Sequence, residues 1–236
     1  NTAPVITCPP SISVSTDPSQ SSALVTVGLP SIVDNCGSYT YTNNFNNTTN
    51  ASGTYPLGIT VVTWTATDAC GNTSSCQMTV TVTDGENPTF ICPPTITVNC
   101  ITEVPVAFNT LAEFIDAGGS ASDNNGINPS SFSLVSQTSD NLSCPETISR
   151  IYTIADVNNN FSTCTQLVVV DDQVAPIITV PADVTVECSA VPAVGTATAT
   201  DNCDAAVTVT YEGEVRTNGT CPDAYTLTRS WKAEDN

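Results

Sequence analysis

The stretch TATDACGNTSSC, residues 65–76, recurs without a gap as TIADVNNNFSTC, residues 153–164. The same offset of 88 residues holds further along the chain, where Cys100 matches Cys188. An internal repeat has to be recognised before local patterns are interpreted, because each copy is one structural unit. The chain therefore consists of tandem repeats.

Both ends of the chain carry further pieces of the repeat. ITCPPSISV (6–14) matches FICPPTITV (90–98), and WKAED (231–235) matches WTATD (64–68). The sequence thus predicts three domains, called here the first, second and third repeats: 1–84, 85–172 and 173–236. We expect the third repeat to be incomplete at its C-terminus, because it stops before a counterpart of the last strand.

Within each repeat the apolar residues alternate with a period of two, which is typical of half-buried strands. Met78, Val80 and Val82 fall on one face, and threonines fall on the other. Threonine and valine are abundant, and only the segment 111–115 has the composition of a short helical turn. Repeats of about 85 residues built from short antiparallel strands predict an all-β chain of tandem immunoglobulin-like β-sandwich domains, held by disulfides.

The composition excludes several classes of function. The 236 residues carry 23 acidic and 4 basic side chains, a net charge of −19, and no histidine. So few cations do not neutralise nucleic-acid phosphates or anionic lipid head groups, so we expect no nucleic-acid partner. The missing histidine removes imidazole catalysis and histidine metal ligands. No apolar run is long enough to predict membrane insertion.

Eleven cysteines occur without any CxxC pair, which favours disulfides in an extracellular or cell-surface protein over a metal ribbon. Differences between the repeats restrict the pairing, because bonded cysteines should disappear together. The second repeat has Asn125 and Asn158 where the first has Cys36 and Cys70. We therefore predict a Cys36–Cys70 bridge.

The same comparison applies to a second set of cysteines. The first repeat has Thr16 where the later repeats have Cys100 and Cys188, and it has no counterpart of Cys144 or Cys221. This absence predicts Cys100–Cys144 and Cys188–Cys221 bridges.

The remaining pairs, Cys8–Cys76 and Cys92–Cys164, tie the first strand of a repeat to its last. Cys203 is then left unpaired within these 236 residues. By analogy with Cys70, its partner is expected at the position after residue 236.

The segments ITCPP (6–10), DNCG (34–37) and YPLGITVVTWTATDACGNTSSCQMTVTV (55–82) resemble the HYR (hyalin repeat) module. The resemblance implies an immunoglobulin-like fold and a role in extracellular adhesion, without catalytic residues. Tandem copies of this kind also resemble the giant surface adhesins of Bacteroidota, including the SprB-type gliding-motility adhesins. The second repeat departs from the HYR pattern because it lacks the cysteine of DNCG. The third departs because it has Val180 in place of the cysteine that corresponds to Cys8 and Cys92.

Acidic residues precede a proline between consecutive repeats, as in the calcium-binding linkers of cadherins. Carboxylate oxygens are ligands that Ca²⁺ prefers. The sequence therefore offers two explanations for these linkers: solvated surface carboxylates beside a turn proline, or a calcium site. The candidate ligands are Asp84, Glu86, Asp171 and Asp172. We expect no other cofactor.

Two further aspartates recur in each repeat, and we interpret them as turn residues in preference to metal ligands. They are Asp34, Asp123 and Asp201, and Asp68, Asp156 and Asp235. Arg150 and Arg229 occupy matched positions, which indicates an ion pair or ring stacking within the domain. Strand phase directs Trp64, Tyr152 and Trp231 into the core.

The predicted function is that of a stalk segment in a large adhesin, with the neighbouring repeats as its partners. One alternative is a module that binds a surface glycan or protein ligand. Another is an accessory region of a secreted enzyme. The segment itself carries no motif that joins a nucleophile to a base, so we do not expect it to be an enzyme.

Overall fold

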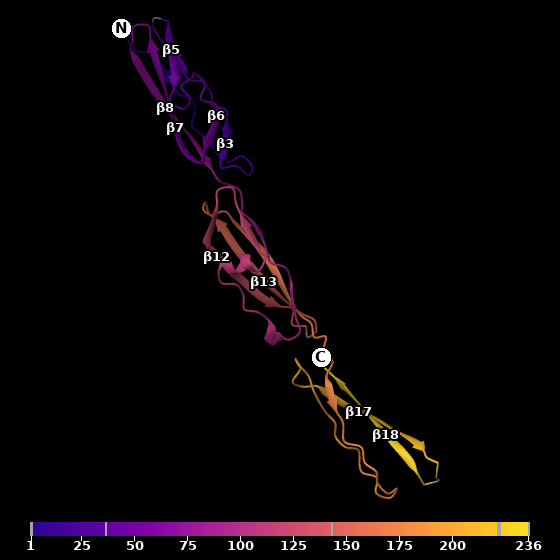
Figure 1. Ribbon diagram of the computed structural model, residues 1–236. Coiled ribbons are helices and arrows are strands. Elements are labelled where there is room, and N and C mark those ends of the chain that lie inside the picture. Colours follow the sequence, from indigo (N-terminus) through magenta and orange to yellow (C-terminus); the bar gives the residue numbers. More distant parts are fainter. Residues whose placement is uncertain (1, 36, 143, 221–222, 236) are drawn as a thin grey trace. The chain divides into compact units, whose positions relative to one another are not determined.

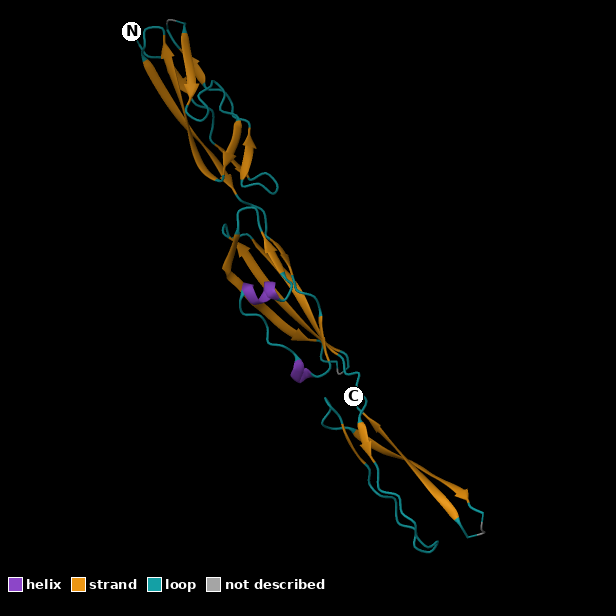
Figure 2. Cartoon of the chain, in the orientation of Figure 1, coloured by secondary structure: helices purple, strands orange, loops and turns teal. Residues whose placement is uncertain are grey.

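The computed structural model describes residues 2–35, 37–142, 144–220 and 223–235. Strands and loops make up nearly all of this part of the chain, with two short helices (Figure 2). The all-β prediction is confirmed. The chain divides into two compact units: residues 1–93, 108–134 and 152–164 form one, and residues 94–107, 135–151 and 165–236 form the other.

The first repeat contains strands of alternating burial, as its sequence period predicts. They are β1 (Val5–Thr7), β2 (Ile12–Ser15), β3 (Ser22–Val25), β4 (Ser31–Val33), β5 (Tyr39–Asn43), β6 (Gly53–Pro56), β7 (Gly58–Asp68) and β8 (Thr73–Thr83). One sheet has the order β2-β8-β7-β5, and two smaller sheets pair β3 with β6 and β1 with β4 (Figure 1). Its core includes Trp64, Val62 and Val80, all fully buried.

The second repeat has two helices, and among its described residues it lacks a counterpart of the β3–β6 pair. Its helices and strands are β9 (Thr89–Ile91), β10 (Ile96–Val98), η1 (Ile101–Glu103), α1 (Leu111–Asp116), β11 (Ser120–Ser122), β12 (Ile127–Ser139), β13 (Glu146–Asp156) and β14 (Phe161–Val170). The sheet order β10-β14-β13-β12 reproduces β2-β8-β7-β5, and β9 pairs with β11 as β1 pairs with β4.

Helix α1 coincides with the segment expected to form a helical turn. Thr110 caps it by accepting a hydrogen bond from the backbone NH of Glu113, and the Glu113 carboxylate accepts the Thr110 NH in return. The helix buries Phe114, whose ring lies 4.9 Å from that of Phe90 and 5.5 Å from that of Tyr152. The helix thus fills the aromatic part of the core.

The expectation of purely antiparallel strands is wrong at one place in each of the two four-stranded sheets. Strand β2 runs parallel to β8, with Ile12 opposite Val80, and β10 runs parallel to β14, with Ile96 opposite Val168. The chain passes from the β1–β4 sheet into the four-stranded sheet at this point. A change of sheet allows a parallel neighbour without a hairpin.

The third repeat contributes β15 (Ile177–Thr179), β16 (Thr198–Thr200), β17 (Thr208–Asn218) and β18 (Tyr225–Glu234). β15 pairs with β16, as β1 with β4, and β17 pairs with β18, as β12 with β13. Trp231 stacks at a tilt on Tyr211 and is only partly buried, whereas Trp64 and Tyr152 are fully buried. The core prediction is therefore confirmed for Trp64 and Tyr152 and is met only in part by Trp231.

Candidate cation sites and the disulfide framework

Two disulfides connect the beginning of a repeat to its last strand, as the sequence predicts. Cys8, just after β1, is bonded to Cys76 of β8 across 68 residues, with the two Cα atoms 5.6 Å apart. Cys92, just after β9, is bonded to Cys164 of β14 across 72 residues, at 5.5 Å. Each bridge adds about 2–4 kcal/mol by restricting the unfolded chain.

The third disulfide joins Cys100 of the second repeat to Cys203 of the third. The predictions of a Cys100–Cys144 bridge and of an unpaired Cys203 are therefore wrong. Cysteines that disappear together within one repeat do not reveal this bond, because it connects consecutive repeats. Cys144 is exposed and has no disulfide partner among the described residues.

Two predicted bridges involve residues outside the described part of the chain. Cys70 and Cys188 are exposed and have no disulfide partner among the described residues. Their predicted partners, Cys36 and Cys221, lie outside the described residues. The pairs Cys36–Cys70 and Cys188–Cys221 stay predictions.

Three carboxylates meet where the first repeat leads into the second. Asp84 follows β8, Asp123 follows β11, and Asp156 ends β13. One oxygen from each lies within 4.8 Å of the others. Three like charges this close repel one another, and a divalent cation would offset that repulsion.

Asp156 is held in place by the turn that its own side chain builds. It is fully buried, and one carboxylate oxygen accepts the backbone NH groups of Asn158 and Asn160, at 2.8 and 2.9 Å. The other oxygen accepts the Asn160 side-chain amide at 2.8 Å. Asp68 makes the same turn with Asn72 in the first repeat. The turn interpretation is thus confirmed for Asp156 and Asp68, and the turn also fixes the orientation of Asp156 as a candidate metal ligand.

Asp84 has a carboxylate oxygen in this cluster that could bind a cation. One oxygen lies 3.5 Å from the hydroxyl of Thr16, and the other is buried without a hydrogen-bond partner among the described residues. Burial raises the pKa of Asp84, but Asn125 and the backbone NH of Glu86 lower it by more, so the carboxyl stays ionised. An ionised oxygen without a donor fits a Ca²⁺ ligand, because Ca²⁺ takes six to eight oxygens at about 2.3–2.6 Å.

A related cluster lies where the second repeat leads into the third. Oxygens of Asp172 and Asp201 lie within 4.8 Å of each other and of the Cys203 sulfur. The backbone NH groups of Asp204 and Cys203 donate to Asp201 and lower its pKa. Asp172 matches Asp84 and Asp201 matches Asp123, so the two clusters share two of their three members. In the second cluster the sulfur belongs to the disulfide and contributes no thiolate.

Only two of the four predicted calcium ligands lie in these clusters. Asp84 and Asp172 do, whereas Glu86 accepts the backbone NH of Ser19 at 2.8 Å. The Asp171 carboxylate faces the Cys144 sulfur at 3.7 Å. The clusters instead recruit Asp123, Asp156 and Asp201, whose recurrence in every repeat was the sequence signal for them.

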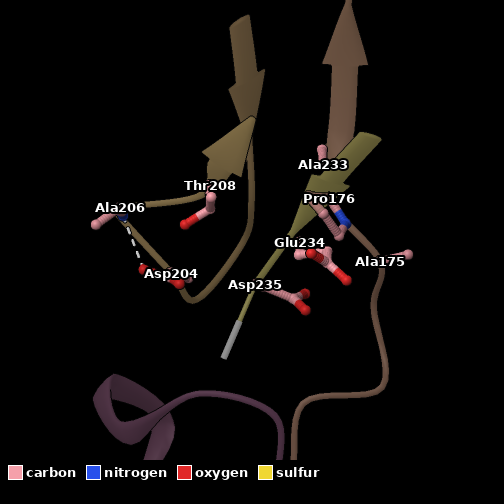
Figure 3. A pocket seen from close by; sticks show the side chains of 8 residues that line it. All are labelled: Ala175, Pro176, Asp204, Ala206, Thr208, Ala233, Glu234 and Asp235. Atoms are coloured by element: carbon pink, nitrogen blue, oxygen red, sulfur yellow. Dashed lines mark hydrogen bonds between the residues drawn. The ribbon is translucent and has the colours of Figure 1, made fainter. Parts of the chain in front are cut away.

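A depression in the third repeat is acidic and lacks aromatic side chains (Figure 3). Its carboxylates are Asp204, Glu234 and Asp235, and Asp204 accepts the Ala206 NH at 2.7 Å. The other lining residues are Ala175, Pro176, Thr208 and Ala233. A planar sugar face would find no stacking partner here.

The two matched arginines hold the same part of the fold. Arg229 forms an ion pair with Glu214 at 2.9 Å and donates to the carbonyl oxygen of Pro192 at 2.8 Å. Arg150 donates to Gln137 at 2.8 Å and to the carbonyl oxygen of Pro105. The ion pair expected within the domain is confirmed for Arg229, and an amide takes the place of the carboxylate at Arg150.

Comparison with known proteins finds a domain family that matches the first repeat. Residues 1–82 match the HYR domain family. HYR domains are typically extracellular, adhesion-related modules with an immunoglobulin-like β-sandwich fold. The match corresponds to the first repeat.

A chain segment of 86 residues is 36% identical to the Sushi, von Willebrand factor type A, EGF and pentraxin domain-containing protein 1 of Rattus norvegicus. The Mus musculus protein of the same name is also 36% identical over 86 residues. The segment is 36% of this chain, and it spans only 2% of the length of either relative.

Among solved structures, a protocadherin gammaB7 EC3-6 cis-dimer is similar at 14% identity and a TM-score of 0.36, covering 97% of this chain and 69% of that chain. Human CDH23 EC21-23 is similar at 13% identity and a TM-score of 0.33, covering 70% of this chain and 63% of that chain. TM-scores this low support no inference about the present chain. In the part of the chain that the structure describes, no helix has the length and apolar character needed to cross a bilayer.

Proposed function

We propose that this chain is a stalk segment of a large extracellular adhesin, which holds adhesive domains away from a surface. The disulfides Cys8–Cys76 and Cys92–Cys164 carry this proposal, because each encloses nearly a whole repeat between its first and last strands. Force applied along the chain then passes through the bridge, and the enclosed residues are shielded from it. The net charge of −19 keeps such a stalk soluble and discourages pairing of strand edges.

The proposed location is the cell surface or the extracellular space, where disulfides persist. Giant surface adhesins of the Bacteroidota gliding type are the proposed parent class, on the resemblance of the tandem repeats. The acidic depression of the third repeat does not favour a glycan-binding role. The repeated architecture supports the role of a spacer that separates other domains from a surface.

We further propose that the Asp84–Asp123–Asp156 cluster binds Ca²⁺. The supporting observation is the buried oxygen of Asp84 that has no donor among the described residues, beside a carboxylate that is fully buried. Ca²⁺ would neutralise part of the repulsion and join the end of the first repeat to two turns of the second. Asp172 and Asp201 would supply the corresponding oxygens further along the chain.

Calcium titration of the whole chain, by calorimetry and by thermal melting, tests this site. We expect binding heat and a raised Tm, because a ligand at 100 times its Kd stabilises by about 2.7 kcal/mol. Asp156→Asn should weaken binding at least tenfold. Asp68→Asn is the matched control, since it alters the same turn outside the two clusters. Equal melting curves in calcium and EDTA, without binding heat, would remove the calcium proposal and leave the stalk proposal standing.

A further inference from the structure

Three cysteines surround the dipeptide Asp171-Asp172. Strand β10 pairs with β14 so that the NH of Asp171 donates to the carbonyl oxygen of Val98 at 2.9 Å. Cys100 follows Val98 by two residues and is bonded to Cys203. The pairing of these strands therefore places a disulfide beside the end of β14.

The third cysteine, Cys144, approaches the same dipeptide and has no disulfide partner among the described residues. Its sulfur lies 3.7 Å from a carboxylate oxygen of Asp171 and 3.8 Å from the carbonyl oxygen of Asp172. The Cys203 sulfur lies within 4.8 Å of the Asp172 carboxylate. The Cys144 sulfur and a disulfide thus border on one residue, and Cys144 is exposed to solvent.

A hydrogen-bond donor already contacts the disulfide. The side-chain amide of Asn202 lies 2.8 Å from the Cys203 sulfur and 3.5 Å from the Cys100 sulfur. A donor at this position stabilises negative charge that develops on Cys203 when the disulfide opens. Exchange is faster when the leaving sulfur is a better leaving group.

The sequence contains two partners for Cys100. Cys100 and Cys144 are matched by Cys188 and Cys221 in the third repeat, which indicates a pair within a repeat. The structure instead shows the bond from Cys100 to Cys203. An exchange between the two partners accounts for both observations.

The Asp84–Asp123–Asp156 cluster has no cysteine at the positions that correspond to Cys100 and Cys203. Thr16 stands in the position of Cys100, and Asn125 stands in that of Cys203. The Thr16 hydroxyl contacts Asp84, the counterpart of Asp172, at 3.5 Å. Both sulfurs are missing there together, and so is a counterpart of Cys144. The Cys100–Cys203 bond and Cys144 therefore occur together where the second repeat leads into the third, and both are missing where the first leads into the second.

We propose that Cys144 is an exchange thiol that moves the bond of Cys100 from Cys203 to itself. The Cys144 thiol first loses its proton to solvent. Its thiolate then attacks the Cys100 sulfur, the Cys100–Cys144 bond forms and the Cys100–Cys203 bond breaks. Cys203 leaves as a thiolate and takes up a proton. One disulfide and one thiol are present before and after, so the step needs neither oxidant nor reductant. Exchange releases a covalent connection between the second and third repeats. If the proposed stalk function holds, loss of this connection would change how far the stalk extends under force. The exchange chemistry itself does not depend on the stalk function.

The test is disulfide mapping of the 236-residue chain after incubation in glutathione buffers, with N-ethylmaleimide trapping and mass spectrometry of unreduced peptides. We expect both Cys100–Cys203 and Cys100–Cys144 peptides, in a ratio independent of protein concentration and of the glutathione ratio. The intact Cys8–Cys76 and Cys92–Cys164 peptides report that the fold is retained. Recovery of a single Cys100 partner under every buffer overturns the proposal.

Variants assign the roles. Cys144→Ser should leave Cys100–Cys203 as the one species, and Cys203→Ser should give Cys100–Cys144. Asn202→Ala should slow the exchange by about two- to tenfold while both bonds still form, since it removes one hydrogen bond to the leaving sulfur. An unchanged exchange rate in Asn202→Ala would refute the role of that amide.

Discussion

Pulling the chain from its ends should reveal how much of it the disulfides shield. In the first repeat, the Cys8–Cys76 bond keeps two Cα atoms 5.6 Å apart although 68 residues separate them in sequence. When the repeat unfolds under force with this bond intact, the enclosed residues stay short. The double variant Cys8→Ser/Cys76→Ser releases them, and at about 3.4 Å per extended residue the unfolded length should grow by about 230 Å.

The second repeat gives a sharper result, because two bridges overlap there. Cys92–Cys164 spans 72 residues, and Cys100–Cys203 spans 103. Even without the first of these, force crosses from Cys100 directly to Cys203. The variant Cys92→Ser/Cys164→Ser should therefore gain almost no length. Molecules in which Cys100 is instead bonded to Cys144 would gain about 28 residues, or about 95 Å.

The assay is single-molecule force spectroscopy with handles at the two termini, under oxidising conditions. Reduced chain serves as the control for full extension. A gain well below about 230 Å in the Cys8→Ser/Cys76→Ser variant would refute the account of the first repeat. A gain near 245 Å in the Cys92→Ser/Cys164→Ser variant would mean that neither Cys203 nor Cys144 restrains Cys100.

Two further predictions concern stability. Trp64 is fully buried, so Trp64→Ala should lower the free energy of unfolding of the first repeat by about 3–5 kcal/mol in urea titrations. Ile59 is 71% exposed, so the control Ile59→Ala should change that free energy by less than about 0.5 kcal/mol. Equal losses in the two variants would contradict the assigned core. The side-chain amide of Asn72 lowers the pKa of Asp68, and the Asp204 NH lowers that of Asp201. Since both carboxyls have lower pKa values folded than unfolded, their stabilisation is complete above the unfolded value near 4 and is lost as pH falls through the folded values. Tm should therefore drop below about pH 4, and Asp68→Asn should make the drop smaller; a Tm that is constant down to pH 2 would exclude this linkage.

The fold was predictable because its signals are local and repeated. Alternating valine and threonine specify strands, and the 88-residue offset fixes the repeats, so the burial of Met78, Val80 and Val82 follows from strand phase alone. The capping pair Thr110 and Glu113 is local in the same way. The parallel pairing of β2 with β8 depends on a change of sheet, which alternation does not encode.

The site was predictable only in part because it combines residues from two repeats. Asp84 and Asp172 stand out beside their prolines, but Asp123, Asp156 and Asp201 serve local turns as well as the clusters. A local turn is enough to explain an aspartate at each of these three positions, so the sequence gives no separate sign of the clusters. The Cys100–Cys203 bond was missed because pairing was sought within a repeat. Comparing Thr16 with Asn125 across consecutive repeats would have indicated it.

Small-angle X-ray scattering of the 236-residue chain, in calcium and then in EDTA, tests the stalk with cation-bound clusters most directly. A single compact body of this length would have a radius of gyration of about 18 Å. We predict a radius of gyration well above about 18 Å in calcium. In EDTA we predict a shorter or broader distribution of interatomic distances, and Asp156→Asn should show the same distribution in calcium. A radius near 18 Å in both solutions would contradict the stalk.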